Sequence, residues 1–234
     1  MTTFRPRILQ CPNCKANMFT FELTSFTVHS SIVYSDGKVD NSSSLSDKQI
    51  LICNDCRKPM WRDDAILNDS DINYETLPEA KDVFDLPFAF DTNRSNKLAF
   101  YYTDLLNDDF ADTSEKEIYL RIKIWHLLNN SSRNTKQRGS IKEIIDKNIS
   151  SELKNSDEKS TKFLFDKNLE HLTKIYKPDC DEQQLLYAEM FRELGDFNEA
   201  KLQLNKINNL YNNSAYKQIA KMIKTKKSNV IKIT

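Results

Sequence analysis

Apolar and polar residues alternate along the first quarter of the chain, and this alternation predicts strands. Phe19, Phe21 and Leu23 are separated by polar residues, which is the two-residue period of a half-buried strand. Further on, the pair Asp36-Gly37 has the composition of a tight hairpin turn. A polar run follows this turn and leads into another short apolar stretch at residues 49–52. We therefore expect a small β-rich unit that ends near residue 62.

Residues 97–225 follow the period of α-helices instead. Ser114 with Glu117, and again Ser140 with Glu143, have the capping-box spacing that begins a helix. Apolar residues then recur every three or four positions before Pro178 ends the run: Phe165, Leu169, Leu172 and Tyr176. These patterns predict an all-α region.

Two charged stretches flank the helical region. Residues 63–96 carry nine acidic side chains against a single lysine, and two prolines interrupt any helix there, so we expect a partly packed acidic linker. From Lys217 onward the chain holds six lysines and no acidic residue. We expect residues 226–234 to be a basic tail, either solvated and frayed or docked electrostatically. The acidic linker and RNA or DNA phosphate are the two candidate docking partners.

The overall composition narrows the class of protein. Over 234 residues, 34 basic side chains balance 34 acidic ones, so no global charge draws the protein to nucleic acid or membrane. The N-terminus lacks the apolar stretch of a signal peptide, and no apolar run reaches the roughly 18 residues that span a bilayer. The 3 glycines are dispersed, which argues against glycine-rich phosphate-binding loops. These features predict a soluble, cytoplasmic protein with no membrane partner.

Four cysteines form two Cys-x-x-Cys pairs, Cys11 with Cys14 and Cys53 with Cys56. Two residues between thiols allow both sulfurs of a tight turn to reach one ion, and two such turns complete a tetrahedral tetrathiolate site. We expect one structural Zn²⁺ per chain, with a zinc-ribbon domain at residues 1–62 folded around it. Four thiolates leave no open position for water or substrate, so the site predicts no catalysis.

Other interpretations of the cysteines stay open. Iron also binds four thiolates, so the sequence does not decide between the two metals. A redox role is disfavoured, because neither pair opens a helix of a βαβ unit. Cys180 is a lone cysteine at a predicted helix start, and a nucleophilic role would need a base such as His171. That pairing is generic, and no catalytic residue is predicted.

The segment 181–214 resembles a single tetratricopeptide repeat, a helix–turn–helix unit of 34 residues. Ala188 and Ala200 occupy the small-residue positions of its two helices, and Gly195-Asp196-Phe197 forms the turn. The tract from Cys53 to Ala65 is also similar to tracts in several bacterial families of unknown function. These resemblances imply a zinc site and a scaffold of helix pairs.

The sequence thus predicts an α+β protein of two domains, a β-rich zinc ribbon followed by a tetratricopeptide-like helical-hairpin domain. We expect a zinc-binding interaction or scaffold protein that is not an enzyme, because stacked helix pairs commonly bind a protein partner on a concave face. A nucleic-acid-binding ribbon is the alternative, with phosphate contacts from Lys15, Arg57, Lys58 and Arg62. An enzyme with an unrecognised active site is a third hypothesis. The sequence indicates neither the identity of a partner nor the oligomeric state.

Overall fold

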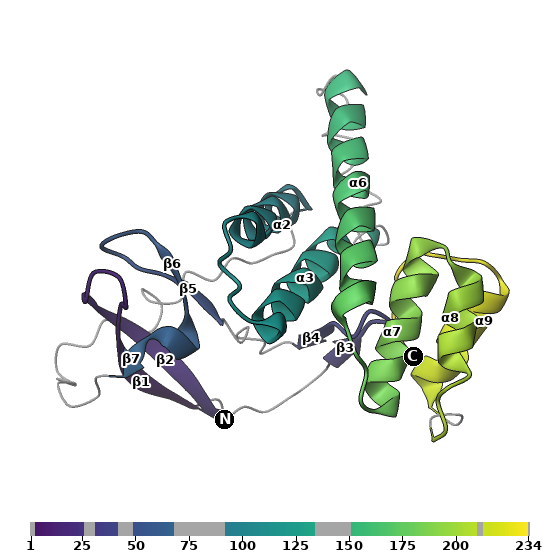
Figure 1. Ribbon diagram of the computed structural model, residues 1–234, viewed down its shortest axis with the longest axis horizontal. Helices are drawn as coiled ribbons and strands as arrows, with labels where there is room; N and C mark the ends of the chain where they lie inside the picture. Colours follow the sequence, from purple (N-terminus) through teal and green to yellow (C-terminus); the bar gives the residue numbers. More distant parts are fainter. Residues whose placement is uncertain are drawn as a thin grey trace. The chain divides into compact units, whose positions relative to one another are not determined.

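The computed structural model divides the chain into two compact units (Figure 1). Met1–Ser31 and Asp40–Pro87 form the first, which we call the ribbon unit, and Ile32–Val39 and Phe88–Thr234 form the second, the helical unit. The structure describes residues 3–25, 31–41, 49–67, 92–133, 151–209 and 213–233. Strands build the first unit and helices dominate the second, which confirms the predicted α+β layout in two parts. The second expected capping box and most of the expected acidic linker lie outside the described residues.

An antiparallel hairpin forms the larger sheet of the ribbon unit. β1 (Thr3–Gln10) pairs with β2 (Asn17–Ser25) over its length, and Leu9 lies opposite Met18. β7 (Ile66–Leu67) pairs with the other edge of β1 near its end. The strand predicted from the alternation at residues 19–23 is therefore confirmed.

A second, shorter hairpin completes the ribbon unit. β5 (Ile50–Ile52) pairs with β6 (Pro59–Trp61), and the 3-10 turn η1 (Arg62–Asp64) follows. Within the described residues, the core cluster of this unit has four buried members, Cys11, Met18, Cys53 and Met60, and Ile8, Leu9 and Trp61 are buried as well. Two of the four cluster residues are cysteines, so the packing of this unit is centred on thiols.

Helices packed in chain order form the helical unit. In the part that the structure describes, they are α2 (Thr92–Asn107), α3 (Ser114–Leu128), α4 (Asn130–Arg133), α6 (Ser151–Ile175), α7 (Asp181–Leu194), α8 (Phe197–Leu204) and α9 (Ser214–Lys224). Apart from the short α4, each packs against the next of these helices along the chain (Figure 1). Trp125 on α3 is fully buried with Leu169 and Leu172 of α6 and Met190 of α7. One core cluster therefore spans the three helices α3, α6 and α7.

The start of α3 differs by one residue from the expectation. Thr113, not Ser114, is the N-cap, and its hydroxyl accepts a hydrogen bond from the Lys116 N–H at 3.3 Å. Two hydroxyl residues follow one another here, and either satisfies the capping preference. The capping box predicted with Ser114 as N-cap is therefore wrong in register, although the helix begins where expected.

The predicted turn at Gly195-Asp196-Phe197 lies between α7 and α8. Gly195 has a left-handed backbone with φ 84°, and the N–H of Asp196 donates to the carbonyl of Phe191 at 2.9 Å. This is the glycine C-cap geometry that ends many helices. The Asp196 carboxylate then accepts the Glu199 N–H at 3.0 Å and caps α8. One glycine and one aspartate thus end one helix and begin the next.

Most of a β-hairpin between the two cysteine pairs belongs to the helical unit. β3 (Ser31–Val33) and β4 (Val39–Asn41) form what we call the inserted hairpin, residues 31–41. Its turn lies at Asp36-Gly37, as predicted, with Gly37 at φ 78°. A Cβ at Gly37 would approach Leu186 Cδ1 of α7 to 3.2 Å, so the tip packs closely on that helix. The boundary expected at residue 62 assigned this hairpin to the ribbon, and the structure groups residues 32–39 with the helices.

The C-terminal segment pairs with the inserted hairpin. The Ser35 N–H donates to the carbonyl of Ile231 at 2.9 Å, and the Ile233 N–H donates to the carbonyl of Val33 at 2.8 Å. Val230 is buried beside this pairing. The expectation of a frayed tail is therefore wrong for residues 230–233, because backbone pairing with a distant strand holds them.

Candidate metal centre

Each Cys-x-x-Cys pair occupies the turn of an antiparallel hairpin. Cys11 and Cys14 lie between β1 and β2, and Cys53 and Cys56 lie between β5 and β6. Strand pairing on both sides fixes the two ends of each turn. The thiols of a pair are therefore held at the same end of their hairpin.

The two turns have the same backbone conformation. In the first, the Cys11 N–H donates to the carbonyl of Ala16 at 2.9 Å, and the Lys15 N–H donates to the carbonyl of Cys11 at 3.0 Å. In the second, the N–H groups of Cys53 and Arg57 make the equivalent bonds, both at 3.0 Å. Lys15 and Arg57 are both left-handed, with φ 65° and 59°. Each turn thus contains one non-glycine residue with a strained, left-handed backbone.

The sequence around the turns is itself repeated. Residues 8–19 read ILQCPNCKANMF, and residues 50–61 read ILICNDCRKPMW. The isoleucine, leucine, both cysteines and methionine are identical, and Met18 and Met60 are both buried in the core cluster of the unit. This repeat extends beyond the cysteine spacing. It predicts that the two segments fold as two copies of one hairpin. The ribbon unit therefore presents two similar turns that each carry a pair of cysteines.

The two turns bring all four thiols together. All four Sγ atoms lie within 4.8 Å of one another, and each cysteine is a free thiol. Between the turns, Cys11 Sγ lies 3.9 Å from Cys56 Sγ, and Cys14 Sγ lies 3.6 Å from Cys53 Sγ. Zn–S bonds of about 2.3 Å in a tetrahedral site place the sulfurs about 3.8 Å apart. The residues present therefore fit one tetrahedral metal ion.

The thiols differ in how readily they ionise. Desolvation raises the pKa of Cys11, but the backbone N–H groups of Cys14 and Asn13 and the neighbouring thiols outweigh it and bring that pKa to about 6. The backbone N–H of Ala16 favours the Cys14 thiolate, but desolvation and hydrogen bonds with the three other thiols raise its pKa to about 11. The Cys11 thiol thus ionises easily, whereas ionisation of Cys14 beside it is unfavourable. A bound cation would offset the negative charge of several neighbouring thiolates.

The basic residues predicted to contact phosphate lie on or after the metal-binding turns. Lys15, Arg57 and Lys58 are exposed, and Arg62 in η1 is half-buried. The Lys15 Nζ donates to the carbonyl of Pro12 within its own turn at 3.1 Å. Lys15 and Arg57 hold equivalent positions directly after the two pairs, where their charge favours thiolates. Phosphate binding by these residues stays a prediction.

Cys180 lies on a different element from the four clustered cysteines. It is the exposed N-cap residue of α7. His171 on α6 instead has its Nε2 3.1 Å from a carboxylate oxygen of Glu117. In the part of the chain that the structure describes, no hydrogen bond joins Cys180 to His171. The arrangement gives no support to a nucleophile–base pair.

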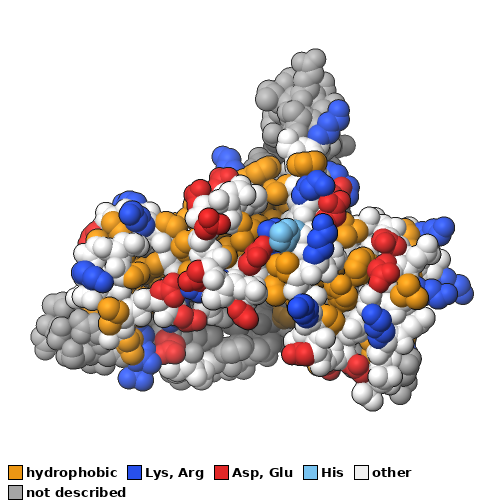
Figure 2. Space-filling view, in the orientation of Figure 1, with side chains coloured by type: hydrophobic (Ala, Val, Ile, Leu, Met, Phe, Trp, Pro, Cys, Tyr) orange, Lys and Arg blue, Asp and Glu red, His pale blue; other side chains and the backbone are white. Residues whose placement is uncertain are grey.

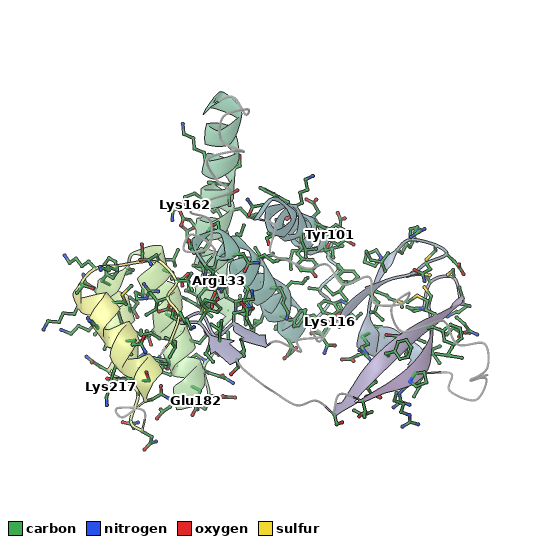
Figure 3. The ribbon with its side chains drawn as sticks, turned by 180° about the vertical axis from the view of Figure 1, so that it is seen from behind. Tyr101, Lys116, Arg133, Lys162, Glu182 and Lys217 are labelled. Atoms are coloured by element: carbon green, nitrogen blue, oxygen red, sulfur yellow. The ribbon has the colours of Figure 1, made fainter. Side chains whose placement is uncertain are left out.

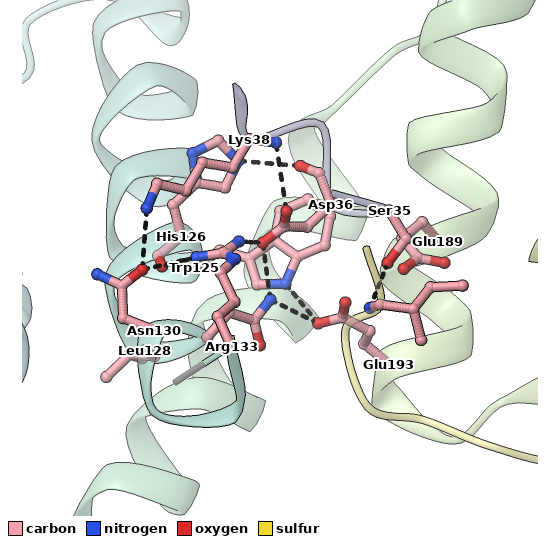
Figure 4. A network of polar contacts seen from close by, with 12 residues as sticks. Ser35, Asp36, Lys38, Trp125, His126, Leu128, Asn130, Arg133, Glu189 and Glu193 are labelled. Carbon is pink, nitrogen blue, oxygen red and sulfur yellow. Dashed lines mark hydrogen bonds and ion pairs between the residues drawn. The ribbon is translucent and has the colours of Figure 1, made fainter. Parts of the chain in front are cut away.

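A second polar cluster surrounds the tip of the inserted hairpin (Figure 4). Asp36 is fully buried, and its carboxylate accepts Asn129 Nδ2 at 2.9 Å and forms an ion pair with Arg133. Its backbone carbonyl accepts a hydrogen bond from His126 Nε2 at 2.9 Å. His126 lies in the last turn of α3, and the other two partners lie at its C-cap and on α4. One turn residue is therefore bound by three side chains from the helices.

Further contacts extend this cluster to α2. Arg133 Nη1 donates to Asn130 Oδ1 at 2.8 Å, and Asn130 Nδ2 donates to Ser95 Oγ at 3.0 Å. Lys38 Nζ, from the inserted hairpin, also donates to Asn130 Oδ1 at 3.0 Å (Figure 4). The Arg133 guanidinium lies 4.7 Å from the centre of the Tyr34 ring. The hairpin, α2 and α4 are thereby joined by polar contacts.

Buried ionisable groups on α7 complete the cluster. Arg192 Nε and Nη2 donate to the two oxygens of the Glu189 carboxylate at 2.6 and 2.5 Å. Glu193 Oε2 accepts Trp125 Nε1 at 2.7 Å and Asn129 Nδ2 at 2.9 Å. Asn129 therefore links the hairpin carboxylate to α7. We call six of these residues the buried ionic network: Asp36, Asn129, Arg133, Glu189, Arg192 and Glu193.

Burial changes the protonation of this network. Desolvation and the nearby Glu189 carboxylate raise the pKa of Glu193 to about 8, although Arg192, Asn129 and Trp125 favour its ionised form. Desolvation lowers the pKa of Arg133 to about 10. The Glu193 Oε1 atom is buried with no hydrogen-bond partner, 3.5 Å from Arg192 Nη2. A protonated carboxyl at neutral pH is consistent with these surroundings.

Sequence reasoning did not identify the buried ionic network. Its one local signal is on α7, where Glu189 and Arg192 fall on the same helical face as the apolar Leu185 and Ala188. Charged residues on a buried face need partners, and those partners lie far away in the sequence. Because its members are buried, the network joins segments of the fold and does not present a reactive surface.

An apolar groove lies on the helical unit between α2 and α6. It has a volume of about 470 Å³ and is lined by Phe100, Thr103, Lys159, Ser160, Phe163 and Leu164. Phe163 is 65% exposed, which is unusual for a side chain of its size. The groove is thus an open surface feature with one cationic side chain in its lining.

Comparisons with known proteins gave no family-model match, and neither curated proteins nor solved structures gave a significant match. The tetratricopeptide resemblance of residues 181–214 and the likeness to bacterial families therefore stay predictions. Among the described helices, none is both long and apolar enough to traverse a bilayer. The assignment of function consequently depends on the geometry of the sites themselves.

Proposed function

We propose that the ribbon unit binds one structural Zn²⁺ through its four clustered cysteines: Cys11, Cys14, Cys53 and Cys56. The observation that supports this proposal is the spacing of the four Sγ atoms, which matches a tetrahedral site. Four thiolates complete the coordination sphere, so the ion stabilises the fold and takes no part in a reaction. Iron is the competing metal for the same four ligands.

The composition of the ribbon core explains why the proposed ion would matter. The buried cluster of the ribbon unit consists of two cysteines and two methionines. Zinc binding to thiolate peptides contributes about 10 to 16 kcal/mol at neutral pH, which exceeds the stability of most small domains. The metal is therefore expected to determine whether this unit folds.

Mass spectrometry of the intact, natively folded chain tests the metal proposal. We expect one zinc per chain in the wild type and none after replacing Cys11 and Cys53 by serine. Cys180→Ser is the matched control, because this exposed thiol lies on a different element, and it should keep the metal. A metal-free ribbon with protected backbone amides, or metal retained by the double variant, would overturn the proposal. Visible absorption from thiolate-bound iron would identify the metal as iron, and the four proposed ligands would stay the same.

We further propose that the helical unit is a protein-binding scaffold and that the chain is not an enzyme. The support is the consecutive packing of helices and the open groove with its exposed phenylalanine. The apolar lining fits apolar side chains of a partner segment, and Lys159 favours an acidic residue beside them. The proposed occupant is therefore an apolar segment of another protein that carries an acidic side chain.

Two matched substitutions test this scaffold role. Phe163→Asp places a charge in the groove, and Leu202→Asp changes an equally exposed apolar residue on α8, 58% exposed, outside the groove. Proteins captured by the wild type from the native cell are purified and their affinities measured by calorimetry. We expect Phe163→Asp to weaken binding at least tenfold and Leu202→Asp to leave it unchanged. A purified partner that binds all three proteins equally contradicts the groove as its site.

A further inference from the structure

The positive charge of the chain is concentrated in its last 35 residues. Glu199 is the last acidic residue, and eight lysines follow it. Residues 1–199 consequently hold 26 basic and 34 acidic side chains. The zero net charge of the whole chain therefore hides a division into an acidic main part and a basic end. Such asymmetry is typical of proteins that bind a polyanion.

The arrangement of α9 places its lysines together on its outer face. Lys217, Lys221 and Lys224 are all exposed and recur at four- and three-residue intervals. At about 100° per residue, these intervals confine the three side chains to roughly 60° of the helix circumference. Ile219 and Ile223 lie on the opposite side and are buried in the core cluster of α7, α8 and α9. The helix thus shows solvent a face of like charges.

Two further lysines extend this face beyond the end of the helix. Lys226 and Lys227 are exposed and follow α9 directly. We call the five residues the C-terminal lysine surface: Lys217, Lys221, Lys224, Lys226 and Lys227. Basic side chains project from the edge of the helical unit formed by α8 and α9 (Figure 2), and Lys217 lies near the start of α9 at the outer end of that unit (Figure 3).

The C-terminal lysine surface is held in place by contacts at both ends. At its start, Asn213 caps α9 by accepting the N–H of Ala215 at 2.7 Å. At its end, the buried Arg192 donates a hydrogen bond to the carbonyl of Lys227. Beyond that point, the chain pairs with the inserted hairpin through Ile231. Because the backbone that carries these lysines is ordered, binding costs less backbone entropy than it would in a disordered segment.

The five lysines lack acidic partners in the part of the chain that the structure describes. No ion pair there joins any of them to an acidic side chain, whereas Lys162 and Lys167 on α6 have such partners. Like charges on one helix face destabilise it slightly, by a few tenths of a kcal/mol per pair. An external polyanion would remove that repulsion.

We propose that the C-terminal lysine surface binds the phosphodiester backbone of nucleic acid. Five exposed cations at neighbouring positions can contact several phosphates of one strand, and the release of condensed counterions drives such contacts. Insertion into a membrane is disfavoured, because the apolar side of α9 is already buried against α7 and α8. The surface contains no aromatic residue for base stacking, so binding is independent of sequence. This inference uses residues apart from the metal site and does not depend on the proposed metal.

Fluorescence anisotropy with a labelled 20-nucleotide oligouridylate tests the proposal on the full, metal-loaded chain. Three to five phosphate contacts predict that affinity falls roughly tenfold to a hundredfold between 50 and 200 mM salt. Replacing Lys217, Lys221 and Lys224 by glutamate should weaken binding at least tenfold at 50 mM salt. All three side chains are exposed, and circular dichroism checks that the helices remain.

Two variants with the same change in net charge serve as controls. Lys97, Lys174 and Lys177 are exposed lysines elsewhere on the helical unit, and their replacement by glutamate should reduce affinity less than threefold. Replacing Arg5, Lys58 and Arg62 of the ribbon by glutamate should also have little effect, and none of these residues directly follows a cysteine pair. Equal losses in all variants, or loss only in the ribbon variant, would overturn the inference. So would the absence of binding at 50 mM salt, or binding to phosphatidylserine vesicles but not to the oligonucleotide.

Discussion

The ribbon unit buries thiols among apolar side chains, whereas the helical unit buries two arginines beside three carboxylic acids. Both clusters join segments that lie far apart in the sequence, and both contain groups that carry charge. The thiols need a cation from outside the chain, but the buried ionic network includes Arg133 and Arg192. With the proposed metal, the stability of the ribbon would depend on metal supply, whereas that of the helices depends on the pairing of groups within the chain.

Removing the metal should separate the two regions most clearly. Chelation with a strong zinc ligand is expected to unfold the ribbon, because a contribution of about 10 kcal/mol is lost. The helices contain none of the four ligands and should keep their circular dichroism signal. Hydrogen exchange would show lost protection at residues 3–25 and 49–67 and retained protection in α3, α6 and α7. Loss of protection in both units together would contradict the comparison.

Breaking the ion pair between Arg133 and Asp36 should destabilise the helical unit and leave the ribbon unchanged. Arg133→Met leaves the Asp36 carboxylate buried without its cation, which is expected to lower the free energy of unfolding of the helical unit by about 3 to 5 kcal/mol. The urea midpoint of the helical signal measures this loss, while the zinc content should not change. Adding Asp36→Asn should recover part of the loss, because no charge is then left unpaired. A loss below about 1 kcal/mol would show that the pair has little structural importance.

A rise in pH should destabilise the helical unit and favour metal binding by the ribbon. Glu193 keeps its proton in the folded chain up to about pH 8, but releases it near 4.5 when unfolded. The folded state therefore binds more protons between these values, and its stability falls as pH rises, by up to about 1.4 kcal/mol per pH unit. The ribbon instead loses its metal as pH falls, because protons compete for the thiolates.

Urea unfolding of the helical unit across this pH range measures the effect of Glu193. Glu193→Gln should remove the pH dependence, since an amide retains the hydrogen-bond acceptor and does not titrate. For the ribbon, a chromogenic chelator should detect more released zinc as the pH falls. If the slope persists in Glu193→Gln, another group causes it.

The smallest expected effects concern left-handed backbone positions. Gly195→Ala should cost about 1 kcal/mol, because a Cβ there meets no atom within 4 Å and only the backbone at φ 84° is strained. Asp109→Gly, at φ 55° shortly after α2, should instead relieve strain and stabilise the helical unit slightly. Thermal unfolding of the two variants tests whether the changes have opposite signs.

Local patterns predicted the cysteine site and most elements correctly. Cys-x-x-Cys spacing, the Asp-Gly turn at Asp36-Gly37 and the glycine at Gly195 each act through a few neighbouring residues, so they can be read directly from the sequence. Burial of Trp125 also follows from helical periodicity.

Long-range pairing was the part that the sequence did not reveal. Nothing near Asp36 indicates that its carboxylate lies against α3 and α4, and nothing near Ile231 indicates pairing with Ser35. Such contacts depend on where the whole chain places each segment. The repeat between residues 8–19 and 50–61 was a signal within the sequence, and it shows that self-comparison carries more information than cysteine spacing.

The position of the inserted hairpin between the cysteine pairs has a consequence for synthesis on the ribosome. Both pairs emerge before any described helix, so the ribbon can take up its ion while α3 has not yet been made. Asp36 precedes Arg133, its ion-pair partner, by 97 residues. At about 5 to 20 residues per second, the hairpin waits several seconds with its carboxylate in water. The inserted hairpin, made before the helices, would then be available as a preformed turn on which they assemble.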